Sequence, residues 1–275
     1  MKKYDVRNRV VAITGSTGGL GGGLARVLVD KGARVALLDI DRRALHAQQA
    51  SLGQSAFGFE TDVRSMSSVN DAMNAAAEHF GGIDIVIANA GIDCVEPLIS
   101  ADPKNFERVI DINLTGVWRT FRSSIPYVAQ RQGYLMAVSS MAAFVHSPLQ
   151  AHYTASKAAV WAMCNSIRLE VRHMGVDVGS VHPTFFQTPM MEQVHSDKAG
   201  LKLWGGNRGG IWKMISIDSV VDGIVNGIES RRDMVVLPKQ NALIAKAPGL
   251  FRPLIEAIGF KEKDVREAIE ISTRR

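Results

Sequence analysis

Short apolar runs alternate with longer segments of helical periodicity from the beginning of the chain to about residue 240. Runs such as IDIVIANAG and GYLMAVSS are apolar throughout, which is typical of strands covered by helices on both faces. The pattern predicts strands at Val10–Thr14, Arg34–Asp39, Ala56–Glu60, Ile83–Ala88, Tyr134–Ser139, Val176–Val181 and Met234–Leu237. It predicts helices at about Leu20–Lys31, Arg42–Leu52, Ser67–Phe80, Pro103–Gln132, Tyr153–Met174 and Ser219–Arg231.

Strand and helix follow one another in strict rotation, and strands joined in this way form right-handed βαβ units. We therefore predict an α/β protein with a single Rossmann-like, doubly wound parallel seven-stranded sheet and helices on both faces. No repeat, low-complexity tract or linker divides the chain. Residues 1–240 are expected to form one domain, and residues 241–275 a C-terminal extension.

The composition narrows the class of protein. The 275 residues are 46% hydrophobic and 21% charged, as in ordinary globular proteins. The net charge of +5 is spread along the chain, so nucleic-acid binding is not expected. Cys94 and Cys164 lack metal-ligand spacing, and no HExxH motif occurs. The first apolar run is too short for a signal peptide, and no segment offers the roughly 20 apolar residues of a membrane span. We expect a cytoplasmic protein with reduced thiols and no metal.

A glycine-rich turn joins the first predicted strand to the first helix in AITGSTGGLGGG. Glycine lets the backbone approach a pyrophosphate closely, and the free N–H groups at the start of a helix favour an anion. The spacing is TGxxxGxG rather than GxGxxG. We predict that a dinucleotide binds here, although a plain tight turn would use similar residues. The expected contacts are Gly15, Thr17, Gly19, Leu20 and Gly21.

Asp39 ends the second predicted strand, where a carboxylate can accept hydrogen bonds from the adenosine ribose hydroxyls. The same carboxylate would repel the 2′-phosphate of NADP, and the glycine turn holds no basic residue to offset the repulsion. We therefore predict NAD(H) as the cofactor in preference to NADP(H). Arg42 and Arg43 would be the phosphate partners in the opposite case, and Asp39 could also cap a helix together with Asp41.

Tyr153 and Lys157 are four residues apart at the start of a predicted helix, so their side chains project from one face. A phenol ionises near pH 10, and an ammonium about 4 Å away would lower its pKa by up to about three units at an effective dielectric constant of 20. A tyrosine brought toward neutral pH in this way can serve as a general acid and base. The pair alone is common by chance, so its weight depends on the surrounding motifs.

Several segments together resemble the short-chain dehydrogenase/reductase family, in the family's order and at its spacings. They are TGSTGGLG at 14–21, DV at 62–63, ANAG at 88–91, Asn113 in DINLTG, Ser140 in VSSMAA and YTASK at 153–157. The similarity covers about residues 7–240. It implies a dinucleotide-binding and catalytic domain that interconverts a secondary alcohol and a ketone by hydride transfer.

The resemblance also implies roles for single residues. Tyr153 would be the catalytic acid and base, Ser140 would hydrogen-bond the substrate oxygen, and Lys157 would lower the pKa of the tyrosine and hold the nicotinamide ribose. Asn113 would kink its helix and hold a water in a proton relay from Lys157. Further cofactor contacts would be Asp62, Val63, Asn89, Ala90, Gly91, Pro183, Phe186 and Thr188; a helix cap at Asp62 and a strand-end turn at 89–91 are the structural alternatives.

Two regions go beyond the family pattern. Thr184 stands in HPTFFQTPM where the family usually has glycine, and its effect on the local backbone is open. The following segment, which in this family covers the substrate, carries Met190, Met191, Trp204, Trp212 and Met214. An apolar, steroid-like or lipid-like alcohol or ketone is therefore the expected substrate, with ordinary packing as the alternative. The histidines His146, His152 and His182 are expected to be packed or solvated.

The extension at 241–275 is apolar near its start, but Pro248 and Pro253 break the pattern into two short amphipathic pieces. These pieces either pack over the substrate pocket or a partner subunit, or lie on a membrane surface. The family resemblance implies a homodimer or homotetramer that pairs through the helices carrying Asn113 and Tyr153. Two other functions stay open: an epimerase or dehydratase with the same Tyr/Lys pair, and a dinucleotide-sensing module, which would not need Ser140, Tyr153 and Lys157 together.

Overall fold

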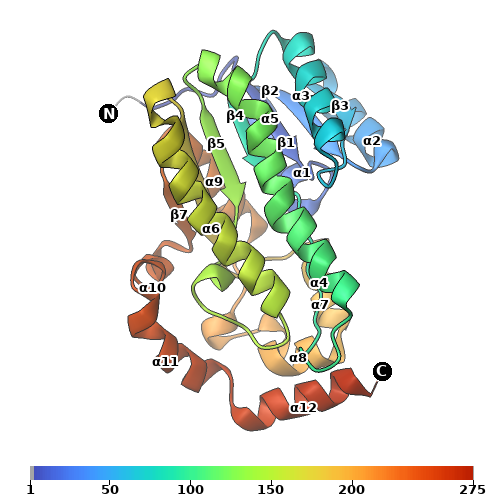
Figure 1. Ribbon diagram of the computed structural model, residues 1–275, viewed down its shortest axis with the longest axis vertical. Helices are drawn as coiled ribbons and strands as arrows, with labels where there is room; N and C mark the ends of the chain where they lie inside the picture. The colour runs from blue at the N-terminus through green and yellow to red at the C-terminus, as the bar shows by residue number, and fades with distance from the viewer. Residues whose placement is uncertain (1–2, 275) are drawn as a thin grey trace.

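Seven parallel strands form one sheet in the order β3-β2-β1-β4-β5-β6-β7 (Figure 1). The computed structural model describes residues 3–274, apart from the side chains of residues 190 and 193. The strands are β1 (Val10–Thr14), β2 (Arg34–Asp39), β3 (Ala56–Glu60), β4 (Ile85–Ala88), β5 (Tyr134–Val138), β6 (Asp177–Pro183) and β7 (Met234–Leu237). The predicted fold class, a doubly wound parallel sheet, is confirmed.

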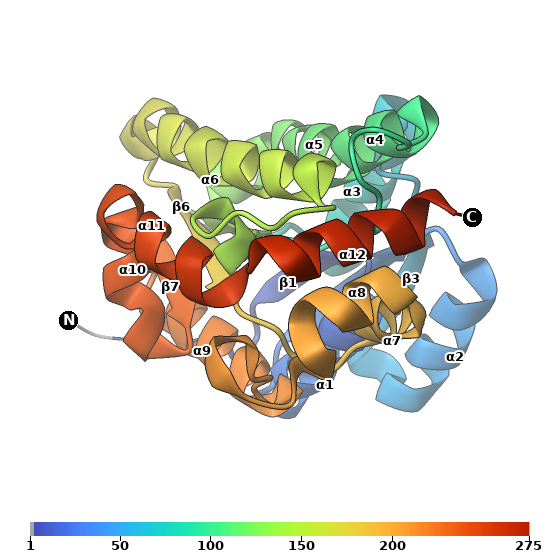
Figure 2. The same ribbon diagram turned by 90° about the horizontal axis from the view of Figure 1, so that it is seen from below.

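Helices cover both faces of this sheet (Figure 2). One layer contains α1 (Gly19–Asp30), α2 (Arg42–Leu52) and α9 (Ile217–Glu229), and the other contains α3 (Met66–Phe80), α4 (Pro103–Ile110), α5 (Gly116–Gln130) and α6 (Ala151–Val171). Successive strand residues point to opposite faces. Val11 and Ile13 of β1 therefore pack with the first layer, and Val10 and Ala12 with the second. Two buried cores result, which explains why the strands are apolar without alternation.

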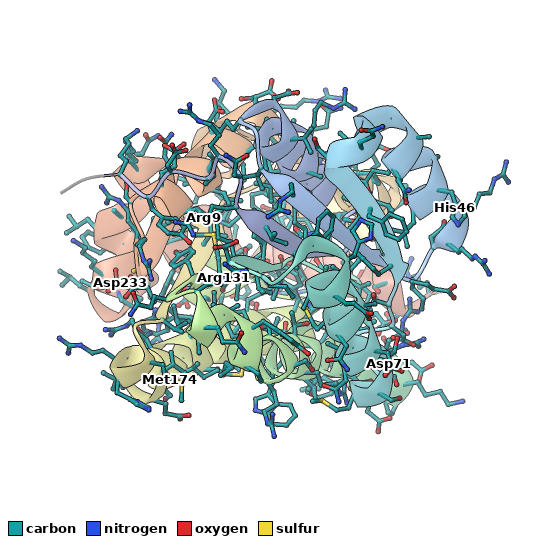
Figure 3. All side chains as sticks on the ribbon, turned by 90° about the horizontal axis from the view of Figure 1, so that it is seen from above. Arg9, His46, Asp71, Arg131, Met174 and Asp233 are labelled. Carbon is teal, nitrogen blue, oxygen red and sulfur yellow. The ribbon has the colours of Figure 1, made fainter. Side chains whose placement is uncertain are left out.

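The carboxyl ends of the strands point toward a group of short helices. This group consists of α7 (Pro189–Ser196), α8 (Lys198–Trp204), α10 (Ala242–Lys246), α11 (Pro248–Gly259) and α12 (Glu262–Thr273). Figure 2 shows α12 crossing the molecule beside α8, and in Figure 1 both helices lie below the sheet. Figure 3 shows the opposite side, where Arg9, Arg131, Met174 and Asp233 flank the amino ends of four strands. Ligands of open parallel sheets bind at the carboxyl ends of the strands, so we expect the site at the end of the sheet that faces these short helices.

The predicted strand bounds agree with the structure at β1, β2, β3 and β7 and differ by one or two residues elsewhere. The single helix predicted at about Pro103–Gln132 is found as one helical run to Gln130, in which a π-helical turn at Asp111–Thr115 joins α4 to α5. The segment after Thr188 forms α7 and α8 in spite of its irregular pattern. The extension contains α10 and α11, as two pieces, and also α12, which was not predicted.

Candidate active site

The glycine turn presents the start of α1 to a cavity. Gly18 caps the helix without a side-chain hydrogen bond, and the first turn holds no acidic residue, so its N–H groups can take an anionic group. Gly15 has φ +64°, and a Cβ on Gly21 would lie 2.2 Å from the carbonyl oxygen of Gly15. Both glycines are therefore required for the turn to close. Gly18, Gly19 and Leu20 line the cavity with them.

Asp39 faces this turn from the end of β2. Its Oδ2 accepts hydrogen bonds from the backbone N–H and the hydroxyl of Thr17, at 3.0 and 2.7 Å. Asp41, not Asp39, caps α2 by accepting from the N–H of Ala44. Asp39 is thus free of a capping role and stays on the cavity wall, where its carboxylate can meet a ribose.

The ANAG segment is locked to the end of β1. The hydroxyl of Thr14 accepts from the N–H groups of Asn89 and Ala90, at 3.0 and 3.2 Å. The amide of Asn89 donates in return to the carbonyl oxygens of Thr14 and Gly15. A Cβ on Gly91 would lie 3.3 Å from Oδ1 of Asn113 and 3.5 Å from Nζ of Lys157, so this wall lies close to both side chains.

Asp62 is paired with Arg64 at the next strand end. Hydrogen bonds from Arg64, followed by its charge, lower the pKa of Asp62 below its ordinary value. Ser65, rather than Asp62, caps α3. Val63 and Asp62 both line the cavity. The helix-cap alternative for Asp62 is therefore wrong.

Asn113 lies inside the π-helical turn and is completely buried behind the cavity. Its Oδ1 accepts from the N–H of Ile92 at 2.8 Å, and its Nδ2 donates to the carbonyl oxygen of Ile92 at 2.9 Å. The same amide lies 3.2 Å from the hydroxyl of Ser156 in α6. Asn113 therefore joins the α4–α5 helix, the segment after β4 and α6 at one point.

Ser140, Tyr153 and Lys157 meet at the centre of the cavity. Ser140 follows β5, where its hydroxyl accepts from the N–H of Ala142 at 3.1 Å. Tyr153 and Lys157 occupy the first two turns of α6, and Nζ of Lys157 is 5.5 Å from the centre of the tyrosine ring. The ammonium donates to the carbonyl oxygen of Val138 at 2.9 Å.

Burial dominates the electrostatics of this group. It raises the pKa of Tyr153 well above the ordinary value; the charge of Asp93 adds to the rise, and a hydrogen bond with Ser140 opposes it. Burial lowers the pKa of Lys157 to about 8, against the attraction of Asp93. The predicted depression of the tyrosine pKa is therefore not found among these side chains, because desolvation outweighs any effect of Lys157.

Asp93 and Gln150 also belong to the site, and sequence reasoning missed them. The side chain of Asp93 is 5% exposed and lines the cavity. Its Oδ1 accepts from the N–H of Cys94 at 2.8 Å, and its Oδ2 accepts from Nε2 of Gln150. Burial raises the pKa of Asp93 to about 7, while these hydrogen bonds and Lys157 oppose the rise. An ionisable residue two positions after the ANAG motif was the signal that could have found Asp93.

A single cavity of about 720 Å³ joins these parts. Every residue predicted for catalysis or cofactor contact lines it except Asn113, including Pro183, Phe186 and Thr188. Its far end is apolar, with walls from the segments after β5 and after β6 and from the C-terminal extension. These walls are Met141, Val145, Phe185, Met191, Trp204, Ile211, Trp212, Ile244, Ile255 and Phe260. Met214 lies outside the lining, and the side chain of Met190 lies outside the described ones.

The backbone at Thr184 is fixed by β7, and the three histidines lie outside the cavity lining. The N–H of Thr184 donates to the carbonyl oxygen of Leu237 at 2.8 Å, so pairing with β7 holds the backbone where glycine is usual. His182 is buried, lies 2.9 Å from the hydroxyl of Ser180, and has its pKa lowered to about 4 by burial. His152 is buried and His146 exposed, and none of the three lines the cavity, as predicted.

Residues 3–274, which the structure describes, contain neither a membrane-spanning helix nor a cluster of metal ligands. No helix in this range is long and apolar enough to cross a membrane. No group of three or more His, Cys, Asp or Glu in the same range could hold a metal ion.

Comparison with known proteins places this geometry among dehydrogenases. A family model described as short chain dehydrogenase matches residues 9–199. A (-)-trans-carveol dehydrogenase of Rhodococcus erythropolis is 35% identical in an alignment of 208 positions that covers 68% of this chain and 74% of that protein. A D-beta-hydroxybutyrate dehydrogenase of Rhizobium meliloti is 30% identical over 197 residues, 70% of this chain and 76% of the other. The crystal structure of a short chain dehydrogenase/reductase from Burkholderia phymatum in complex with NAD aligns with a TM-score of 0.80, at 21% identity, over 90% of this chain and 97% of that one.

Proposed function

Because this chain belongs to the short-chain dehydrogenase/reductase family, we propose that it interconverts a secondary alcohol and a ketone with NAD(H), using Tyr153 as the catalytic acid and base. The observation that carries the proposal is the single cavity in which Ser140, Tyr153 and Lys157 face the same space as the glycine turn and Asp39. A dinucleotide-sensing module would need only the second half of that cavity.

The residues present suit a nicotinamide dinucleotide. The start of α1, whose N–H groups receive no side-chain cap, can bind a pyrophosphate. Asp39 offers acceptors to a ribose, and Asp62 and Val63 form the wall beyond. Lys157 would hold the second ribose, and Asn89, Ala90, Pro183, Phe186 and Thr188 would surround the nicotinamide end. When bound, the nicotinamide supplies the hydride acceptor for alcohol oxidation and the hydride donor for ketone reduction.

The protein side chains supply the proton chemistry. Tyr153 gives a proton to the carbonyl oxygen in reduction and takes one from the hydroxyl in oxidation, while Ser140 hydrogen-bonds the same oxygen. The raised pKa keeps the phenol protonated at neutral pH, which suits the donor role. Lys157, whose pKa of about 8 leaves it mostly charged at neutral pH, stabilises the phenolate after the proton has left. Asn113 positions this machinery through Ile92 and Ser156.

NAD(H) is proposed over NADP(H) because Asp39 would stand against a 2′-phosphate. Its carboxylate is fixed by two hydrogen bonds from Thr17, so it cannot turn away easily. Arg42 and Arg43 lie on the exposed start of α2. The NAD-bound relative supports the cofactor class.

The apolar far end of the cavity favours an apolar substrate. Its walls combine Trp204, Trp212, Ile255 and Phe260 from three separate segments, which surround a hydrophobic skeleton better than a short polar one. The carveol dehydrogenase acts, by its name, on an apolar cyclic alcohol. A lipid-like or steroid-like alcohol or ketone is the proposed substrate class.

The proposed assembly is a homodimer or homotetramer in the cytoplasm that pairs through α5 and α6. Trp118 of α5 and Leu169 of α6 are exposed, and burying them would be favourable. A membrane-surface role of the extension is the alternative for Leu250, Leu254 and Ile258 of α11, which are also exposed.

The deciding experiment is a screen of cyclic and linear secondary alcohols and ketones in which NADH absorbance measures turnover. Ser140→Ala and Tyr153→Phe are the controls. The proposal expects turnover with at least one neutral alcohol or ketone, and its loss in both variants. Turnover that persists in Tyr153→Phe, or NADH binding without oxidation or reduction of any alcohol or ketone in the screen, would refute it.

A further inference from the structure

The cavity wall beside the reacting group carries a buried carboxylate to which the reaction assigns no role. Asp93 is the second residue after Gly91, and its backbone is fixed because Asn113 holds both the N–H and the carbonyl group of the preceding Ile92. The rotation of its side chain is fixed as well, by the N–H of Cys94 at one oxygen and Nε2 of Gln150 at the other. Asp93 is therefore a rigid feature of the cavity.

Gln150, its partner, is held just as firmly. Leu149, directly before it, has φ +62°, an uncommon conformation for a residue with a branched side chain. The carbonyl oxygen of Leu149 accepts from the N–H of Glu96 at 2.9 Å, and Nε2 of His152 lies 3.0 Å from the carbonyl oxygen of Cys94. These contacts tie the loop after β4 to the start of α6, so the Asp93–Gln150 pair bridges two walls of the cavity.

A carboxylate has about four acceptor positions, and two of those on Asp93 are used by protein donors. The remaining capacity suits a hydroxyl of the substrate. A carboxylate on the substrate would instead meet the negative charge of the ionised Asp93 in a poorly solvated space, where repulsion is strong. This contrast separates neutral substrates from hydroxy acids.

We propose that Asp93 determines substrate class: it accepts a hydrogen bond from a second hydroxyl close to the reacting carbon, and it excludes substrates that carry a carboxylate there. This inference rests on the proposed dehydrogenase function and specifies its substrate as a neutral, apolar diol or hydroxyketone. Hydroxy acids such as the substrate named for the D-beta-hydroxybutyrate dehydrogenase are then poor substrates here.

Other ionisable groups around Asp93 affect how the selection varies with pH. They are Tyr153, Lys157 and His152 on α6, Cys94 and Glu96 on its own loop, and Arg108 of α4, which is exposed and lines the same cavity. Since the pKa of Asp93 is about 7, its negative charge grows between pH 6 and pH 8. Lys157, with a pKa of about 8, loses positive charge near the top of that range. Both changes act against an anionic ligand as the pH rises.

The test compares the wild type with Asp93→Asn and Glu96→Gln. Glu96 is the matched control, because it carries the same charge on the same loop and does not line the cavity. Three substrates share one skeleton: cyclohexanol, cyclohexane-1,2-diol and 2-hydroxycyclohexanecarboxylate. In the wild type at pH 8 we expect kcat/KM for the diol to exceed that for cyclohexanol by about tenfold, as for a hydrogen bond to a charged group, and the hydroxy acid to be about a hundredfold poorer than cyclohexanol.

Asp93→Asn should abolish the diol preference and improve the hydroxy acid by at least about tenfold, whereas Glu96→Gln should keep the wild-type order. NADH affinity, measured by fluorescence, should be unchanged in both variants. Equal discrimination in wild type and Asp93→Asn, or no preference in the wild type, would overturn the assignment.

A second measurement needs no turnover. Cyclohexanecarboxylate and cyclohexanecarboxamide are titrated into the NADH complexes of the wild type and of Asp93→Asn between pH 6 and pH 8.5. The dissociation constant of the carboxylate divided by that of the amide should rise with pH more steeply in the wild type than in the variant, where only Lys157 still titrates in this range. The same slope in both proteins would overturn the assignment of Asp93. If the slope is steeper in the wild type but no alcohol is oxidised, the proposed function fails while the binding role of Asp93 stands.

Discussion

Nζ of Lys157 donates a hydrogen bond to the carbonyl oxygen of Val138 at 2.9 Å, so the cation of the site is attached to the end of strand β5. The hydroxyl of Ser139, the next residue, donates in turn to the carbonyl oxygen of Lys157. The end of β5 therefore holds the lysine at its backbone as well as at the tip of its side chain. This anchoring explains how Lys157, which is only 4% exposed, is kept beside Tyr153 in spite of the cost of burial.

We first predict that Tyr153→Phe and Lys157→Ala have different effects. The phenylalanine variant loses only the proton-transfer group, so kcat should fall by at least about a hundredfold while NADH affinity stays close to that of the wild type. Lys157→Ala should weaken both, since the lysine also belongs to the cofactor wall. Stopped-flow kinetics and NADH fluorescence measure the two effects. Residual activity of Tyr153→Phe above about a hundredth of the wild type would contradict the role of the tyrosine.

The second prediction concerns cofactor choice. Asp39→Ala removes the carboxylate that Thr17 holds toward the cavity, and with it the repulsion of a 2′-phosphate. We expect kcat/KM with NAD to fall by about tenfold, as for loss of hydrogen bonds to a charged group. The value with NADP should rise, because Arg42 is close in the sequence. Asp41→Ala is the control, because it removes a helix cap and should leave the NAD to NADP ratio unchanged. Wild-type efficiency that is equal with both cofactors would refute the role of Asp39.

The sequence was sufficient for the sheet and for most of the cavity wall. Four strands begin and end where the apolar runs do, because turns rich in glycine, aspartate or asparagine limit them. The cofactor residues were found because the glycine turn and Asp39 stand at strand ends, which parallel topology brings to one edge.

The remaining features depend on contacts that a local pattern does not contain. Asn113, inside the π-helical turn, hydrogen-bonds through its side chain to both backbone groups of Ile92, which is 21 residues away in the sequence. Helix α12 is stabilised by packing on α8 and by ion pairs from Lys202 to Asp264 and Glu267. The sign of the tyrosine pKa shift was wrong because charge spacing is visible in a sequence and burial is not.

The third prediction is a pH-dependent gain in stability for Asp93→Asn. The pKa of Asp93 is about 7 in the folded protein and near 3.8 when exposed, so the folded state binds more protons between these values. The stability contributed by this group therefore falls as pH rises from about 4 to about 7, and above pH 7 the folded protein bears the full free-energy cost of a buried, ionised carboxylate. Asparagine cannot ionise, so the variant does not bear this cost. We expect the variant to melt at a higher temperature than the wild type at pH 8, by several degrees or more.

The same variant provides its own control for that prediction. At pH 4, where Asp93 is protonated in the folded protein, asparagine and aspartic acid are nearly equivalent, and the two melting temperatures should coincide. Thermal unfolding followed by circular dichroism at pH 4, 6 and 8 measures the trend. A constant difference across this range would mean that Asp93 is not buried as an ionisable group.

The last prediction tests whether the C-terminal extension forms part of the substrate site. Ile255 and Leu254 are neighbours on α11, but Ile255 lines the cavity while Leu254 is 60% exposed. Ile255→Ser removes apolar contact with a bound substrate, so KM for an apolar alcohol should rise by roughly tenfold with little change in kcat. Leu254→Ser makes a comparable change away from the cavity and should leave KM unchanged. Any effect of Leu254→Ser should appear in sizing chromatography or liposome sedimentation, which measure whether the exposed face of α11 binds a second subunit or a membrane. Equal KM values in the two variants would mean that the extension is not a wall of the substrate site, even though it lies against the cavity.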